Sequence, residues 1–283
     1  MQGRVLVIAG SDSGGGAGIQ ADIKTVTALG GYAMTAITAL TAQDTRGVSA
    51  IHDVPPNFVA AQARVVLADI GADCVKIGML HTPEVIEIVA AVVAAEASGI
   101  PVVLDPVMVA KGGAPLLRTD AVERLRETLL PRATVLTPNI PEAETLAGRS
   151  IRDRDDMEAA GRALLAQGPD AVLVKGGHLS GDVVYDALVS ADGTRIFESP
   201  RIDTSNTHGT GCTLASAIAT GLAQGMGLAD SVARARAYVI EAIRSAPGLG
   251  HGHGPLNHGL TVRPFRTAHL GEGHDGSDGG PSA

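Results

Sequence analysis

The sequence predicts an α/β fold with a mainly parallel central sheet, helices on both faces and a β-hairpin at one edge. Short apolar runs alternate with longer segments of helical spacing, which is typical of a parallel sheet. Hydrophobic residues make up 45% of the 283 residues and aromatic residues only 2%, so the core has to be built from small aliphatic side chains. Such a core suits strands that are buried under helices on both sides.

The predicted strands are short, apolar and mostly rich in β-branched residues. Those of the parallel sheet are residues 5–9, 36–40, 74–77, 102–104, 134–136 and 171–174. Two further runs, 183–189 and 195–198, are joined by a turn-forming segment that contains Asp192 and Gly193. This pair breaks the strand–helix alternation and predicts the edge hairpin.

The predicted helices follow from apolar spacing and start signals. Thr82, Pro83 and Glu84 read as an N-cap, an N1 proline and a first-turn acid, and Pro55-Pro56 begins the preceding helix. The predicted helices are residues 17–29, one that begins at Pro55-Pro56 and reaches Ile70, one that opens at residues 82–84, a short one from residue 139, 212–223 and 228–243. Without internal repeats or linkers, residues 1–262 are expected to form one domain, followed by a Gly-, His- and Ser-rich tail, 263–283, that is expected to be disordered.

Charge and cysteine content exclude several classes of protein. The net charge is −8 and no long Lys/Arg run occurs, which disfavours nucleic-acid binding. Cys74 and Cys212 are the only cysteines, which indicates a reducing compartment without a disulfide. The longest apolar stretch, 85–97, contains two glutamates, so no membrane span is predicted. We expect a cytoplasmic protein.

The most informative segment is Asn206–Thr213. Gly209, Thr210 and Gly211 open a predicted helix, and the N–H groups of a helix start can close around an anion. Cys212 lies in the same turn, where we expect the thiol pKa to fall from about 8.5 toward neutrality. Cys212 is then a base or a nucleophile, and both phosphoryl transfer and acyl transfer remain open. The structural alternative is a small buried hydrophobic residue.

Polar residues follow three of the predicted strands directly: Asp105, Asn139 with Glu142, and Lys175. Ligands of open α/β sheets bind outside the carboxyl ends of the strands. Asp105 suits either an N-cap or turn position or hydrated Mg²⁺. Lys175, followed by two glycines, suits phosphate oxygens or a solvated turn. Asn139 and Glu142 taken alone are interpreted first as a helix capping box. Together these residues favour phosphoryl transfer.

The glycine-rich loop from Gly10 to Gly18 follows the first strand and is expected to contact a ligand. Its end, Gly16-Ala17-Gly18, also matches a dinucleotide-binding pattern, with Asp44 at roughly the distance of a ribose-binding acid. A NAD(P)-binding oxidoreductase is therefore an alternative, although the loop is longer than the tight turn of such sites.

In their order, these motifs resemble the ribokinase-like superfamily and, within it, the hydroxymethylpyrimidine and phosphomethylpyrimidine kinases of thiamin biosynthesis. The resemblance extends from Val5 to about Thr261. The motifs that carry it are residues 10–22, 41–45, 137–139, 174–178 and 206–213. It implies ATP-dependent phosphorylation of hydroxymethylpyrimidine and then of its monophosphate. The alternatives are a pyridoxal kinase of the same fold and a non-catalytic pyrimidine-binding regulator.

The resemblance also implies roles for individual residues. It gives the anion hole to Gly209, Thr210, Gly211 and Cys212, with Cys212 as the catalytic base. It gives substrate binding to Gln43, Asp22, Gly10 and Gly18, ATP binding to Lys175, Asn139 and Thr207, and Mg²⁺ binding through water to Asp105 and Glu142. The implied partners are a small pyrimidine and ATP, with neither nucleic acid nor membrane; a homodimer is expected, and a monovalent cation is a further candidate cofactor.

Overall fold

The computed structural model describes residues 3–263. Its main feature is an eight-stranded sheet in the order β10-β9-β8-β7-β6-β5-β1-β2. The strands are β1 (Arg4–Ala9), β2 (Tyr32–Ile37), β5 (Cys74–Ile77), β6 (Val102–Leu104), β7 (Val135–Leu136), β8 (Ala171–Lys175), β9 (Val183–Ser190) and β10 (Gly193–Pro200). Neighbouring strands among β8, β7, β6, β5, β1 and β2 pair in parallel. Strand β9 pairs antiparallel with β8 and forms the edge hairpin with β10. The predicted fold class is confirmed.

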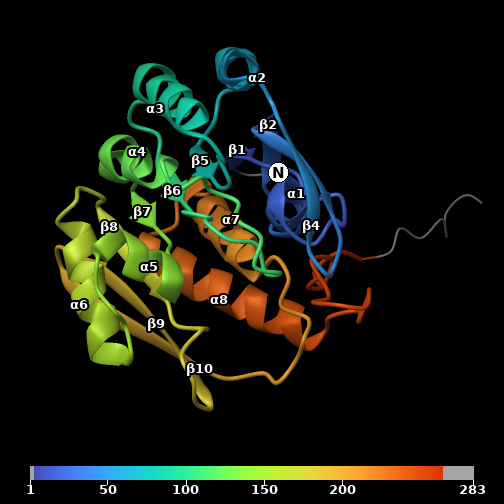
Figure 1. Cartoon of the computed structure of the whole chain (residues 1–283), viewed down its shortest axis with the longest axis vertical. Helices are drawn as coiled ribbons and strands as arrows, with labels where there is room; N and C mark the ends of the chain where they lie inside the picture. Colours follow the sequence, from blue (N-terminus) through green and yellow to red (C-terminus); the bar gives the residue numbers. More distant parts are fainter. Residues whose placement is uncertain (1–2, 264–283) are drawn as a thin grey trace, which may run out of the picture.

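Helices cover both faces of the sheet (Figure 1). One face carries α2 (Pro56–Asp69), α3 (Pro83–Glu96), α4 (Ala121–Thr128), α5 (Ile140–Ala147) and α6 (Arg154–Leu165), and the other carries α1 (Gly18–Ala28), α7 (Thr210–Ala223) and α8 (Leu228–Arg244). A 3-10 turn, η1 (Leu130–Arg132), follows α4. Alternate residues of a strand face opposite sides. Leu6 and Ile8 of β1 accordingly enter the core under α2 and α3, while Val5 and Val7 enter the core under α7 and α8.

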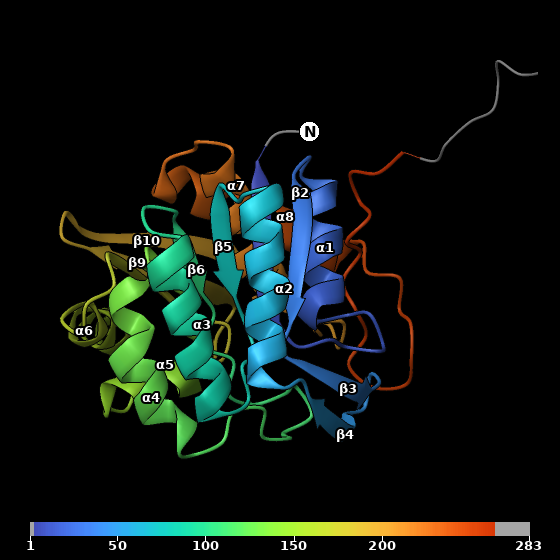
Figure 2. The ribbon, with the colours of Figure 1, turned by 90° about the horizontal axis from the view of Figure 1, so that it is seen from above.

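The prediction of one strand at residues 36–40 is wrong. The chain leaves the main sheet at Thr38, whose hydroxyl donates to the Met79 carbonyl (2.6 Å). Beyond it, β3 (Ala39–Gln43) pairs with β4 (Val48–Asp53) in a separate antiparallel sheet. Figure 2 shows this small sheet at the end of the molecule toward which the arrows of β2 and β5 point. The break therefore places Gln43 at the carboxyl ends of the parallel strands.

Residues 251–257 tie this small sheet to the rest of the domain. The His253 N–H donates to the Thr45 carbonyl (2.7 Å), between β3 and β4. Pro255 forms a parallel bridge with His208, just before α7. Within the described residues, no helix is long and apolar enough to cross a membrane. The expectation of a disordered tail falls, apart from Arg263, outside the described residues.

Candidate active site

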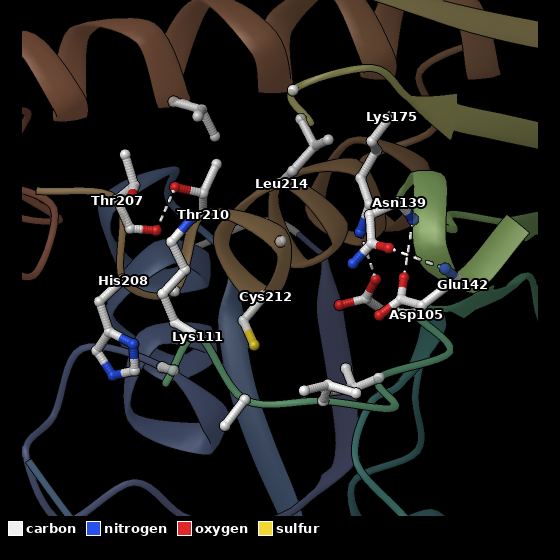
Figure 3. Close-up of a pocket in the computed structure, with 18 of the residues that line it drawn as sticks. Asp105, Lys111, Asn139, Glu142, Lys175, Thr207, His208, Thr210, Cys212 and Leu214 are labelled. Atoms are coloured by element: carbon white, nitrogen blue, oxygen red, sulfur yellow. Dashed lines mark hydrogen bonds and ion pairs between the residues drawn. The ribbon is translucent and has the colours of Figure 1, made fainter. Parts of the chain in front are cut away.

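A cavity of about 790 Å³ lies at the carboxyl ends of the parallel strands. It brings together almost all of the residues that the sequence singled out. Those that line it are Gly10, Gly18, Gln43, Asp105, Asn139, Glu142, Lys175, Thr207, Gly209, Thr210, Gly211 and Cys212. Asp22 is the exception. Figure 3 shows Lys175, Asp105, Asn139 and Glu142 grouped on one side of α7, with Cys212 at the centre of the view.

The buried Asp105 and the partly buried Lys175 form an ion pair across two strand ends. Lys175 Nζ lies 2.8 Å from Asp105 Oδ1, which also accepts from the Thr137 hydroxyl at 3.0 Å. Burial alone would raise the pKa of Asp105, but the Lys175 and Lys76 ammonium groups lower it below its ordinary value. A Cβ on Gly211 would lie 3.3 Å from Lys175 Nζ. The ion pair therefore adjoins the start of α7.

Asn139 and Glu142 form the capping box of α5, as the structural alternative predicted. The Asn139 side chain accepts from the Glu142 N–H (3.0 Å), and Glu142 accepts from the Asn139 N–H (2.8 Å). Both residues nevertheless line the cavity. Burial raises the pKa of Glu142 to about 7, against the attraction of Lys175.

The carboxylates of the cavity fit Mg²⁺ only when other ligands, such as waters and phosphates, complete its coordination. Residues 3–263 contain no group of three His, Cys, Asp or Glu side chains that could hold a metal ion. Asp105 and Glu142 supply two carboxylates to the lining of the cavity. Mg²⁺ commonly binds through one or two carboxylates together with waters and substrate phosphates. These residues therefore fit a metal that arrives with a nucleotide rather than one in an all-protein cage.

The first turn of α7 depends on glycine. Gly209 is the N-cap, with φ of 81°, and a Cβ there would overlap the carbonyl oxygen of Gly16. The Thr213 hydroxyl donates to the Gly209 carbonyl (2.8 Å) and also contacts His258 Nε2 (2.9 Å). The turn is thus held against the glycine-rich loop. The Thr210 N–H donates to the Thr207 carbonyl (3.3 Å). The N–H groups of Gly211 and Cys212 have no partner within the helix and are available to an anion.

Cys212 points from this turn into the cavity (Figure 3). Burial raises the pKa of its thiol to about 11, because the nearby Lys76 ammonium offsets only part of the desolvation of a thiolate. The expectation of a lowered pKa is therefore wrong. The helix start favours a negative charge, but the removal of water from around the sulfur has the larger effect. The thiol is protonated at neutral pH.

Asp12 organises the glycine-rich loop, and the sequence analysis did not identify it. The carboxylate is 1% exposed and accepts from three backbone N–H groups, of Gly14 (2.8 Å), Gly16 (3.0 Å) and Ala17 (2.7 Å). It also bonds His208 Nε2 at 2.8 Å. Burial would raise the pKa of Asp12, but these bonds lower it below its ordinary value. An aspartate inside a glycine-rich loop is a signal that could have identified it.

Asp22 does not reach the cavity. It is fully buried, and both of its carboxylate oxygens bond Lys76 Nζ, at 3.0 and 2.9 Å. Ser216, one turn after Cys212 on α7, donates to the same carboxylate (2.7 Å). Lys76 itself lines the cavity. Burial opposes its charge, but the acidic groups around it, Asp22 first among them, together raise the pKa of Lys76 above its ordinary value. The structure thus places Asp22 behind Cys212 rather than beside a substrate.

The far end of the cavity is built from β1, α1 and β3. Gly18 begins α1 with φ of 55°, and a Cβ there would lie 2.5 Å from the Gly10 carbonyl oxygen. Gln43 is held by its backbone N–H to the Ser13 hydroxyl (2.8 Å). Its side-chain carbonyl accepts from Thr41 (3.2 Å), so its amide N–H groups remain available.

The sheet order bears on the dinucleotide alternative. In the described residues β1 has one further parallel strand, β2, on one side and four on the other. The dinucleotide fold has the order 3-2-1-4-5-6. The match of Gly16 to Gly18 with a dinucleotide pattern therefore lies in a different fold.

Comparisons with known proteins agree with this geometry. The family model for phosphomethylpyrimidine kinase matches residues 12–257. The chain is 56% identical over 265 residues to the thiamine biosynthesis bifunctional protein ThiED of Geobacter sulfurreducens, which covers 94% of this chain and 54% of that protein. The chain thus spans about half the length of that relative.

Two further proteins are similar over nearly their whole length. The hydroxymethylpyrimidine/phosphomethylpyrimidine kinase of Streptomyces coelicolor is 49% identical over 258 residues, which cover 91% of this chain and 95% of that protein. The structure of an ADP complex of Bacillus subtilis pyridoxal kinase superposes with a TM-score of 0.85 at 36% identity, over 92% of this chain and 98% of that one. The family match and the identities show that the chain belongs to the phosphomethylpyrimidine kinase family.

Proposed function

We propose that this chain transfers the γ-phosphoryl group of ATP to hydroxymethylpyrimidine and then to the resulting monophosphate. The observation that carries the proposal is the place of α7. Its first turn adjoins the Lys175–Asp105 pair on one side, and Cys212 of the same turn faces the cavity that Gln43 lines. A phosphate donor and an acceptor can therefore meet at one set of backbone N–H groups.

The donor binds at the strand ends of β6, β7 and β8. Lys175, Asn139 and Thr207 contact the ATP phosphates. Asp105 and Glu142 would hold Mg²⁺ through its waters, and the metal would supply charge neutralisation on the phosphates. Lys175 adds a fixed positive charge at the leaving group.

The acceptor oxygen attacks the γ-phosphorus, and the bond from that phosphorus to the bridging oxygen of ADP breaks. The transition state is loose, so positioning and charge stabilisation supply most of the catalysis. The N–H groups of Gly209 to Cys212 stabilise the oxygens of the transferring group. In the first transfer, the hydroxyl proton passes to the minor thiolate form of Cys212. In the second transfer, the acceptor phosphate is already ionised, because its second pKa is about 6.

Gln43, Gly10 and Gly18 form the acceptor end. The Gln43 amide can both donate to and accept from the edge of an aminopyrimidine. Pyridoxal kinase is the second candidate function, because a pyridoxal kinase has the same fold at 36% identity. The strand order and the family match exclude the NAD(P)-binding oxidoreductase.

A coupled assay of ADP release tests the proposal with hydroxymethylpyrimidine, its monophosphate and pyridoxal as separate acceptors. Turnover of the first two, with kcat/KM above that for pyridoxal, supports it. In the Gln43→Met variant the preference should move toward pyridoxal. Turnover of pyridoxal alone, or pyrimidine binding without ADP release, would overturn the proposal.

Further attributes of the proposed enzyme are a Mg²⁺ requirement, a homodimeric state and a location in the cytoplasm, with a monovalent cation as an additional cofactor. The two cavity carboxylates support the first of these. Titration of activity with Mg²⁺ and K⁺, and light scattering of the purified protein, test these attributes separately.

A further inference from the structure

The connection between β6 and α4 contains a hairpin-like loop, residues 108–116, which we call the roof loop. The Leu116 N–H donates to the Met108 carbonyl (2.8 Å), and the Ala110 N–H donates to the Ala114 carbonyl (2.8 Å). Ala110 and Leu116 pack with Ala39 of β3 in a small apolar cluster. The roof loop is thus internally bonded and fixed against the small sheet, while its inner side lines the cavity.

Lys111 lies at the tip of the roof loop. The next residue, Gly112, packs against the turn between β3 and β4, where a Cβ would lie 2.8 Å from the Arg46 carbonyl oxygen. Lys111 lines the cavity together with Thr210 and Cys212. In Figure 3 its side chain extends from the roof loop into the cavity, toward Thr210 at the start of α7. The ammonium group therefore enters the region where donor and acceptor meet.

Lys111 differs from the other basic side chains of the cavity. The other lysine and arginine side chains that line the cavity bond to carboxylates or backbone carbonyls of the chain. These acceptors are Asp22 for Lys76, Asp105 for Lys175, Asp186 for Arg236 and three backbone carbonyls for Arg201. Lys111 makes no hydrogen bond or ion pair with any residue between 3 and 263. Its charge is therefore not compensated within the described chain.

The second proposed acceptor carries a negative charge that the first lacks, and this charge is opposite in sign to that of Lys111. Hydroxymethylpyrimidine presents a neutral hydroxyl, whereas its monophosphate adds about −1.5 to −2 at neutral pH. This charge has to approach the γ-phosphate of ATP. Lys76 and Lys175 are already neutralised by Asp22 and Asp105. An uncompensated ammonium group near the start of α7 offsets the repulsion that only the second transfer meets.

We propose that Lys111 binds the phosphate group of the monophosphate acceptor and so determines the efficiency of the second transfer. This inference rests on the proposed function. Lys111 is a specificity-determining residue that leaves the first transfer largely unaffected, because a neutral hydroxyl gives its ammonium group nothing to bind. The loop fixes the position of Lys111, since its tip is seated on the β3–β4 turn.

The experiment compares full-length Lys111→Gln and Lys111→Arg with the wild-type protein in single-acceptor assays. Lys111→Gln should lower kcat/KM for the monophosphate about tenfold or more, because it removes a charge-assisted hydrogen bond. For hydroxymethylpyrimidine the change stays within about threefold, and Lys111→Arg restores most of the second activity. Arg118→Gln is the matched control: it removes the same charge from an exposed Arg118–Asp120 pair beyond the roof loop.

A binding measurement without ATP completes the test. Calorimetric titration of the monophosphate should show weaker binding to Lys111→Gln than to wild type, and the loss should shrink as salt is added. Equal losses for both acceptors, or no loss for either, would overturn the inference while leaving the proposed function intact. A wild-type protein that phosphorylates neither pyrimidine would instead overturn the proposed function. In that case the binding measurement still tests Lys111, and equal monophosphate binding by Lys111→Gln and wild type would reject this inference too.

Discussion

Asp12 and His208 lie 196 residues apart in the chain and share a buried 2.8 Å hydrogen bond between Asp12 Oδ2 and His208 Nε2. This bond joins the glycine-rich loop after β1 to the residue before the Gly209 N-cap of α7. This buried contact therefore joins two loops that both line the cavity.

We expect Asp12→Asn and His208→Gln to lower kcat/KM about 10- to 100-fold, because a displacement of about 1 Å in a positioning group has effects of that size. Both variants also lose roughly 1–3 kcal/mol of unfolding free energy, since a buried partner is left without its bond. Kinetics with either pyrimidine and urea unfolding provide the measurements. Normal kinetics in both variants would show that the contact does not position the loops.

Replacement of Gly209 by alanine separates backbone strain from steric overlap. Gly209 and Gly225 have φ of 81° and 80°, but a Cβ overlaps Gly16 only at Gly209, and at Gly225 it meets no heavy atom within 4 Å. Gly225→Ala should cost about 1 kcal/mol. Gly209→Ala should cost clearly more and abolish most activity, because the first turn of α7 has to move. Thermal unfolding and the assay compare the two; equal effects would contradict the steric argument.

The raised pKa of Cys212 predicts the pH dependence of the first transfer. With a thiol pKa of about 11, the thiolate fraction increases about tenfold for each pH unit below that value. The rate with hydroxymethylpyrimidine should therefore increase from pH 7 to 9, and the rate with the monophosphate should increase far less. Cys212→Ala should remove the increase.

Cys74→Ala is the control for this pH profile, because Cys74 is buried in β5 and does not line the cavity. Its first transfer should keep the wild-type slope with pH. A wild-type rate that is flat with pH, or equal losses of both transfers in Cys212→Ala, would reject Cys212 as the proton acceptor.

The buried Asp22–Lys76 pair predicts strong coupling between two substitutions. Lys76→Met leaves the Asp22 carboxylate without its cation and should cost about 3–5 kcal/mol of unfolding free energy. The double variant Lys76→Met with Asp22→Asn should be more stable than Lys76→Met alone, because the amide carries no charge and can still accept from Ser216. Urea unfolding of the two single variants and the double variant measures the coupling. Additive losses would contradict the proposed ion pair.

The sequence predicted strands and helices best where apolar side chains are concentrated. The run from Cys74 to Ile77 and the helix start at Thr82 were both confirmed, since Thr82 accepts a hydrogen bond from the Val85 N–H at 3.3 Å. Helices α4 and α6 were missed. Helix α4 has eight residues and buries only Ala121 and Leu125, so its apolar face is short. The start of α6 carried a readable signal, because the Asp153 side chain caps it.

The site was predictable wherever a residue follows a strand, as for Asp105 and Lys175. The sequence did not predict properties that depend on burial or on contacts between residues far apart in the chain. The thiol pKa of Cys212 depends on desolvation that the helix start alone does not reveal. Lys76 could have been noticed, since a lysine inside an apolar strand needs a buried partner. That the partner is Asp22 is known only from the structure, in which the two side chains meet.

Pro255 contacts His208, and Gly16 packs against both residues. These contacts have a consequence for synthesis on the ribosome. The loop that follows the first strand is made early, but its final neighbours are translated almost last. Domains emerge from the ribosome N-terminal part first. A nascent chain that ends before residue 255 can form much of the sheet, yet it lacks the segment that closes the glycine-rich loop. The glycine-rich loop can therefore reach its final packing only after residue 255 has been made.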